Sequence, residues 1–144
     1  MDSRKVDMML ITLSVIGGLV SLYLWDFHLR SSSILCLTGC DKVLSSEYGV
    51  MLGVPVAAYG FAFYAILILM VFIRLNIRHL LIDRILGGLL FWGILFSLYL
   101  RYLEFFVLYD ICMWCWVSFV IIIMMTVLFI YEAKGRFKEL ITHK

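Results

Sequence analysis

The sequence predicts an all-α integral membrane protein, a four-transmembrane-helix bundle with an outer loop that carries a short surface helix. Composition is the first reason: the 144 residues are 65% hydrophobic and 15% charged, whereas soluble domains carry about 45–50% apolar and about 25% charged residues. The apolar residues also gather in four segments, each near the roughly 20 residues that cross a bilayer. The length suits one domain, residues 1–144, and a net charge of +2 gives no reason to expect a nucleic acid partner.

The four segments cover residues 6–25, 55–73, 85–100 and 111–131. The first is longer than the core of a signal peptide, and no small-x-small cleavage site follows it, so we expect a retained helix. The third is the shortest, and we expect it to continue past Arg101, whose long side chain can snorkel to the membrane interface. One terminal Arg costs about 2.5–3.5 kcal/mol at most, which several Leu, Ile, Phe and Val at about −0.3 to −0.6 each can outweigh.

The Lys and Arg residues predict the orientation. Nine of them flank the ends that include both termini: Arg4, Lys5, Arg74, Arg78, Arg84, Lys134, Arg136, Lys138 and Lys144. The other three are Arg30, Lys42 and Arg101. The positive-inside rule therefore places both termini in the cytoplasm and residues 26–54 and 102–110 on the outer side. All four cysteines then lie in or beside the outer segments, where disulfides persist.

The long outer loop predicts structure of its own. Asp41 is a candidate cap for a short helix over residues 42–52, with Gly39 and Gly53 near its ends. The apolar side of this helix would lie on the bundle at the membrane surface. Pro55 suits the first turn of the second spanning helix.

The pair Cys112-Met-Trp-Cys115 is the strongest candidate for chemistry. With Asp110 as the N-cap, Cys112 would lie in the first turn of the fourth helix, where free backbone N–H groups favour a thiolate. Cys115 lies one turn deeper on nearly the same face. This arrangement suits a thiolate that meets an apolar electron acceptor. The alternative is a pair of packing cysteines, since Cys is a common small buried residue.

The pair Cys36-Leu-Thr-Gly-Cys40 lies in the outer loop. A mobile dithiol there would accept electrons from a soluble partner and carry them inward. Two alternatives stay open. The pair could be a static structural disulfide, or the four cysteines could bind zinc. No histidine supports a metal site, because His79 and His143 fall on the cytoplasmic side and His28 is isolated, so we expect no metal.

Aromatic residues are dense near the predicted outer surface. Trp114, Trp116 and Phe119 are the candidates to line a pocket for a flat quinone ring, and Phe119 follows Cys115 by four residues. The alternative is that these side chains form an interfacial belt and part of the core.

Two runs resemble the vitamin K epoxide reductase family. The first is Phe105-Phe-Val-Leu-Tyr-Asp-Ile-Cys112-Met-Trp-Cys115, which resembles the family's run into its fourth-helix Cys-x-x-Cys. The second is Cys40-Asp-Lys-Val-Leu-Ser-Ser-Glu-Tyr-Gly followed by Leu52-Gly-Val-Pro-Val, which resembles the outer loop with paired serines of bacterial homologues. With the four helices, the resemblance covers about residues 10–131.

The resemblance implies a role for each motif residue. Cys115 matches the cysteine that reacts with the quinone, and Cys112 matches its partner. Cys40 matches the inner loop cysteine that exchanges with this pair, and Cys36 the outer one that faces the thiol partner. Ser46 matches a loop serine near the quinone pocket. The chain departs from the animal enzymes in two places: the stretch after the serines is short, and Phe119 replaces a tyrosine.

The resemblance implies a bacterial inner (plasma) membrane enzyme that works as a DsbB-like thiol oxidase. Electrons would pass from a separate thioredoxin-fold, DsbA-like protein through the two cysteine pairs to a quinone of the ubiquinone or menaquinone type. We expect no fused thioredoxin-like domain, and membrane lipid as surroundings. The alternative enzyme is a vitamin K quinone or epoxide reductase, and the non-enzyme alternative is a membrane scaffold with structural disulfides.

Overall fold

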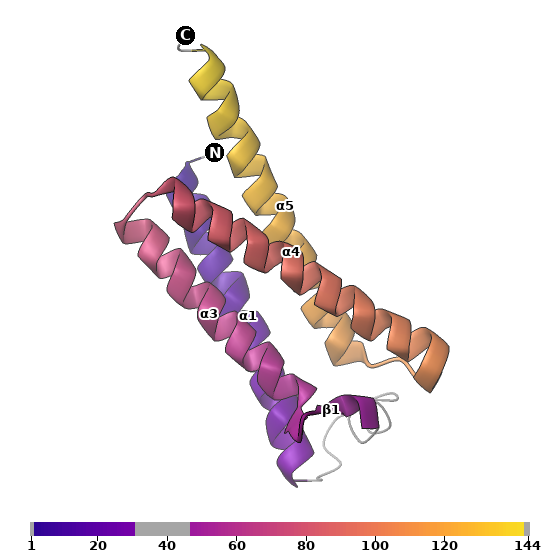
Figure 1. The fold of residues 1–144 in the computed structure, drawn as a ribbon. Coiled ribbons are helices and arrows are strands. Elements are labelled where there is room, and N and C mark those ends of the chain that lie inside the picture. The colour runs from indigo at the N-terminus through magenta and orange to yellow at the C-terminus, as the bar shows by residue number, and fades with distance from the viewer. Residues whose placement is uncertain (1, 31–46, 143–144) are drawn as a thin grey trace.

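Four long helices form the fold, as the hydropathy predicts (Figure 1). The computed structural model describes residues 2–30 and 47–142, except the side chain of Leu140. The helices are α1 (Ser3–Arg30), α3 (Val56–Asn76), α4 (Leu80–Leu103) and α5 (Met113–Thr142). Both chain ends lie at the same end of the bundle, and the segment with β1 lies at the other (Figure 1). We call these the terminal end and the loop end.

The helices extend beyond the apolar segments on which the prediction rests. Helix α5, the fourth of the long helices, continues to Thr142, well past the apolar stretch that ends at residue 131. Many large apolar side chains point away from the bundle, among them Leu19, Phe72, Phe91, Trp92 and Ile130. Contiguous apolar surface of this extent marks contact with lipid. The chain is therefore a multi-pass membrane protein.

Small residues let the helices approach one another closely. A Cβ atom added at Gly17 of α1 would lie 2.4 Å from the ring of Tyr64 of α3. One added at Gly93 of α4 would lie 2.7 Å from the ring of Phe63. Close packing at these glycines brings Tyr64 into the centre of the bundle, where the residue is 2% exposed.

A short hairpin precedes α3. A 3-10 turn, η1 (Glu47–Gly49), leads into β1 (Val50–Met51), which pairs antiparallel with β2 (Val54–Pro55). Leu52 and Gly53 form the turn with positive φ angles of 54° and 80°. The predicted helix over residues 42–52 is therefore wrong for its last three residues, because this turn reverses the chain. Pro55 ends β2 and immediately precedes α3, instead of lying in its first turn.

Helix α4, the third of the four long helices, continues past Arg101, as predicted. It ends in a five-residue π-helix, η2 (Glu104–Leu108). Tyr109, with a positive φ of 52°, turns the chain toward α5. The expectation that Arg101 snorkels to the interface is wrong. Its side chain is 7% exposed and pairs with Glu104, three residues on, because a carboxylate one turn away compensates its charge within the bundle.

At the terminal end, a buried ion cluster joins all four helices. Arg74 of α3 contacts Asp7 of α1, Asp83 of α4 and Glu132 of α5. Arg74 and Asp7 are 1% and 0% exposed, so the centre of the cluster is sealed from solvent and lipid. Arg136 also contacts Asp83, at 2.8 Å. The cluster fixes one end of the bundle and leaves the loop end to be shaped by other contacts.

Candidate functional site

The two described cysteines lie where the chain enters α5. The helix begins at Met113, so Cys112 lies one residue before it and its carbonyl accepts the Trp116 backbone N–H at 3.2 Å. The prediction of Asp110 as N-cap, with Cys112 in the first turn, is therefore wrong by about two residues. The Cys112 side chain is 0% exposed and packs with Val20 and Leu24 of α1.

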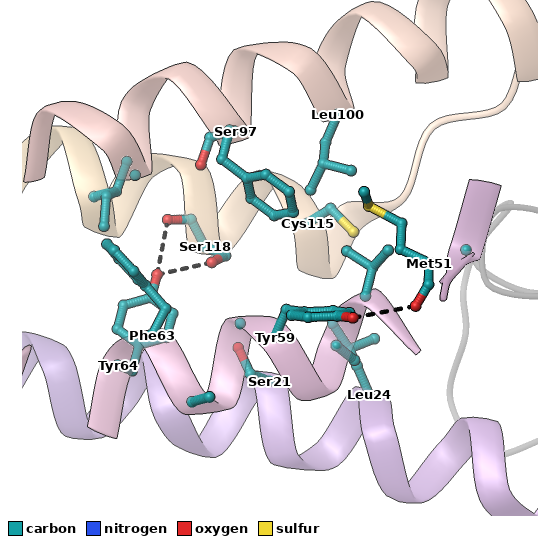
Figure 2. A pocket seen from close by; sticks show the side chains of 18 of the residues that line it. Ser21, Leu24, Met51, Tyr59, Phe63, Tyr64, Ser97, Leu100, Cys115 and Ser118 are labelled. Atoms are coloured by element: carbon teal, nitrogen blue, oxygen red, sulfur yellow. Dashed lines mark hydrogen bonds between the residues drawn. The ribbon is translucent and has the colours of Figure 1, made fainter. Parts of the chain in front are cut away.

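Cys115 lies in the first turn of α5 and lines a cavity of about 550 Å³. The cavity lies between α1, α3, α4 and α5, and the hairpin segment lines it at the loop end (Figure 2). Apolar side chains form most of its wall, among them Leu24, Phe63, Phe96 and Leu100. A largely apolar cavity of about 300–1,000 Å³ with a few polar groups is typical of a small-molecule site.

Two hydroxyl groups meet in the inner part of this cavity. The Tyr64 hydroxyl lies 2.8 Å from Ser118 Oγ and donates to the Ser118 carbonyl at 3.3 Å (Figure 2). Ser118 follows Cys115 by three residues on α5, and Tyr64 reaches it because Gly17 leaves room for the ring. The cavity wall therefore carries a linked pair of hydroxyl groups, one of them three residues along α5 from the thiol.

Tyr59 connects the hairpin to α3. Its hydroxyl donates to the carbonyl of Met51 at 3.2 Å, and both residues line the cavity (Figure 2). Tyr48 and Leu52, from the same hairpin segment, line it too. The hairpin, which the sequence did not predict, thus closes the loop end of the cavity.

A buried ion pair also lines the cavity beside Cys115. Arg101 Nη2 donates to Glu104 Oε1 at 2.8 Å, and Nη1 pairs with Oε2. The Glu104 side chain lies near the Cys115 thiol in the wall of the cavity. The guanidinium of Arg101 lies 5.1 Å from the centre of the Trp116 ring and 5.9 Å from that of Phe119, so aromatic faces cover its other side.

The match to known families fits this arrangement. A sequence model of the vitamin K epoxide reductase family matches residues 8–130, which include all four cysteines and more than half of each of the four helices. The chain belongs to the vitamin K epoxide reductase family. No curated protein matched the chain. Members of the vitamin K epoxide reductase family are oxidoreductases that use quinone or vitamin K substrates, and the Cys112–Cys115 pair beside an apolar cavity agrees with that chemistry.

The three aromatic residues predicted to line the pocket lie elsewhere. Trp114, Trp116 and Phe119 are not among the described residues that line the cavity. The Trp114 ring packs 5.2 Å from that of Tyr23, and its buried Nε1 has no hydrogen-bond acceptor among the described residues. Trp116 contacts Phe119 edge to face at 6.0 Å.

Helix geometry explains the difference. From Cys115, the face of α5 that borders the cavity continues through Ser118 and Ile122, at spacings of three and seven residues, and leaves Phe119 to the side. Helical spacing alone did not show whether Ser118, three residues after Cys115, or Phe119, four residues after it, faces the cavity. The pair of Arg101 and Glu104 was also missed, although two opposite charges three residues apart in an apolar run are a detectable signal.

The loop residues stay predictions. Cys36, Cys40 and Ser46 lie outside the described residues, so their roles as shuttle dithiol and quinone-pocket serine rest on the resemblance alone. Within the described part of the chain, no group of three or more His, Cys, Asp or Glu side chains could hold a metal ion. A site formed with the loop cysteines is not tested by that finding.

Proposed function

We propose that this protein is a membrane thiol:quinone oxidoreductase that drives disulfide formation. A thioredoxin-fold protein reduces the Cys36–Cys40 disulfide, this dithiol reduces Cys112–Cys115, and Cys115 passes the electrons to a quinone. The observation that carries the proposal is the position of Cys115, which lines an apolar cavity with Cys112 buried three residues away. In such an exchange chain, each thiolate attacks the next disulfide, so the two pairs need access to each other.

The shape and polarity of the cavity support a quinone as the acceptor. Its volume of about 550 Å³ accommodates a substituted ring. Val56, Ile66 and Trp92, at its border, are apolar, which suits an isoprenoid tail that enters from lipid. The linked hydroxyls of Tyr64 and Ser118 line the cavity, and one of them can donate to a ring oxygen. A neutral hydrogen bond of this kind contributes about 0.5–1.5 kcal/mol.

The proposed location is a bacterial inner membrane with both termini in the cytoplasm. The Lys and Arg distribution supports this orientation. In the fold, the two termini share one end of the bundle and α5 begins, beside Cys112, at the other, so cytoplasmic termini would put Cys112 on the opposite side (Figure 1). The cysteines would then face the oxidising compartment, where a thioredoxin-fold partner is available.

The test uses purified full-length protein, a reduced thioredoxin-fold oxidase and either ubiquinone or menaquinone. We expect quinol formation that follows oxidation of the partner protein in equal amounts, and its loss in Cys115→Ser. Met113→Leu, next to Cys112 and outside the cavity lining, is the matched control and should keep wild-type turnover. A wild-type protein that neither oxidises the partner nor reduces quinone would refute the proposal in favour of a scaffold.

The hydroxyl pair favours a second candidate, reduction of vitamin K epoxide. A hydroxyl near the attacked ring is a possible donor to an epoxide oxygen, and Tyr64 and Ser118 supply one although Phe119 does not. We still expect quinone to be the better substrate. Side-by-side turnover of the quinone and the epoxide decides between the two, and Tyr64→Phe should lower epoxide turnover more than quinone turnover if both occur. Equal turnover of the two substrates would contradict our choice.

A further inference from the structure

The ion pair of Arg101 and Glu104 is placed differently from an ordinary structural pair. Both side chains are nearly buried, at 7% and 2% exposed, yet both line the cavity instead of a packed interface. A buried ion pair is often no more stabilising than apolar residues of similar volume, because both charges lose their hydration. Stability alone therefore gives little reason for two charges at this place.

The contacts of Glu104 point to the reacting sulfur. One side of its carboxylate is held by Arg101 through a 2.8 Å hydrogen bond and a second nitrogen–oxygen contact. The carboxylate and the Cys115 thiol border the same cavity, near each other. A carboxylate can only accept a hydrogen bond, so a proton shared by these two groups comes from the thiol. The geometry thus places a proton acceptor beside the thiol that faces the cavity.

Other groups in the cavity are poorly suited to carry this proton. Among the described residues that line it, Glu104 has the only carboxyl group, and none is a histidine. The remaining polar side chains are hydroxyls, such as Tyr64 and Ser118, and the guanidinium of Arg101. Hydroxyls and guanidinium do not readily take up a proton near neutral pH. A general base must also lie near the proton that it takes up, and Glu104 borders the cavity beside Cys115.

We propose that Glu104 is the proton carrier between Cys115 and the quinone, and that Arg101 is the residue that positions it. The inference rests on the proposed function. Oxidation of the Cys112–Cys115 dithiol forms one S–S bond and releases two electrons and two protons, and the quinone takes up both electrons and two protons to become quinol. Glu104 takes the Cys115 proton as the thiolate forms and gives it to a ring oxygen. The Cys112 proton accounts for the second hydroxyl of the quinol.

The same arrangement explains why Arg101 accompanies the carboxylate. An isolated carboxylate in an apolar cavity would be costly, and it would repel the thiolate that must form next to it. Arg101 compensates one negative charge, so the pair of Cys115 and Glu104 can exchange a proton while the net charge of the group stays constant. The fixed two-point contact also limits rotation of the carboxyl group and keeps it against the sulfur.

The experiment compares three variants of the full-length protein: Glu104→Gln, Glu104→Asp, and the double variant Arg101→Gln with Glu104→Gln. The first removes the proton acceptor but leaves Arg101 uncompensated. The double variant removes both charges, so it separates loss of the carboxyl from loss of charge balance. Two readouts are measured: steady-state quinol formation, and alkylation of Cys115 in the reduced protein without quinone, followed by mass spectrometry of the Cys115 peptide.

We expect both glutamine variants to reduce quinone about 10²-fold more slowly than wild type, within the range for loss of a general acid–base group. KM for the quinone should change little. Alkylation of Cys115 in the double variant should match wild type, since the thiol and the cavity are intact, and it should rise in Glu104→Gln, because the thiolate then faces Arg101 alone. Glu104→Asp, which keeps a carboxyl group, should exceed both glutamine variants.

Recovery of near-wild-type turnover in the double variant would overturn the inference, because Glu104 would then serve only to compensate Arg101. Turnover of Glu104→Asp no higher than that of the double variant would also count against it. If Glu104→Gln does not fold, turnover of the double variant and of Glu104→Asp still tests whether Glu104 carries the proton. A wild-type protein that reduces no quinone would instead defeat the proposed function, which distinguishes the two failures.

Discussion

Replacing Arg74 with methionine should lower the free energy of unfolding by about 3–5 kcal/mol, the cost of removing one partner from a buried ion pair. Arg74 donates to both oxygens of Glu132 at 2.8 Å, to Asp83 at 2.6 Å, and to Asp7. The loss is not the sum of three pairs. Asp83 keeps Arg136 at 2.8 Å, whereas Glu132 keeps only a 3.6 Å contact with the same side chain. Most of the expected cost therefore comes from Glu132.

A matched control is available in the same cluster. Arg78 pairs with Asp7 at 3.2 Å, but its side chain is 43% exposed. Exposed pairs contribute about 0–1 kcal/mol, so Arg78→Met should have a small effect. The double variant Arg74→Met with Glu132→Met removes the uncompensated carboxylate as well, and it should regain about half of the loss or more, because apolar residues can replace a buried pair.

The assay is denaturant unfolding of the purified protein in detergent micelles, followed by circular dichroism, with quinone reduction as a second measurement. The cluster lies at the terminal end, away from Cys115, so the folded fraction of each variant should keep its turnover (Figure 1). An Arg74→Met protein within about 1 kcal/mol of wild type, or equal to Arg78→Met, would refute the reasoning, since the charges would then be solvated in a way that their burial does not allow.

The remaining predictions concern the outer loop. An impermeant maleimide applied to reduced, intact cells should label Cys36 or Cys40, and labelling that requires permeabilised cells would reverse the proposed orientation. Combining Cys36→Ser with Cys115→Ser should trap a disulfide between Cys40 and Cys112, and peptide mapping that finds none would count against electron transfer through the loop. Ser46→Ala should slow quinone reduction about 5-fold or more with normal expression, while alanine at the preceding serine should have less effect. Similar turnover in both serine variants would leave only a solvating role.

The four helices could be predicted because transfer of long apolar segments into lipid dominates their energetics. Helix ends were less predictable. Backbone hydrogen bonds continue into polar residues, as at Ser3 and Thr142, where hydropathy carries no signal. The hairpin was missed for a related reason. Leu52 takes a positive φ of 54°, which is uncommon for a residue other than glycine. Leucine is therefore not a residue from which a turn is predicted.

The candidate site divides in the same way. The Cys112–Cys115 pair is visible in the sequence because its members are neighbours on one helix. The hydroxyl contact between Tyr64 and Ser118 joins residues 54 positions apart and depends on the room left by Gly17, so only the packed bundle reveals it. Prediction from helical spacing chose Phe119, since a three-residue and a four-residue step lie at similar angles from Cys115.

The two buried charge sites show how the same interaction serves different ends of one bundle. At the terminal end, Arg74 contacts three carboxylates, and each of these also contacts Arg78 or Arg136. Each of the three carboxylates there is bound by Arg74 from another helix, so none is free to take part in a reaction. At the loop end, Arg101 holds one carboxylate, and that carboxylate lines a cavity together with the Cys115 thiol. Substituting the first site should therefore change stability with turnover preserved, and substituting the second should change turnover more than stability.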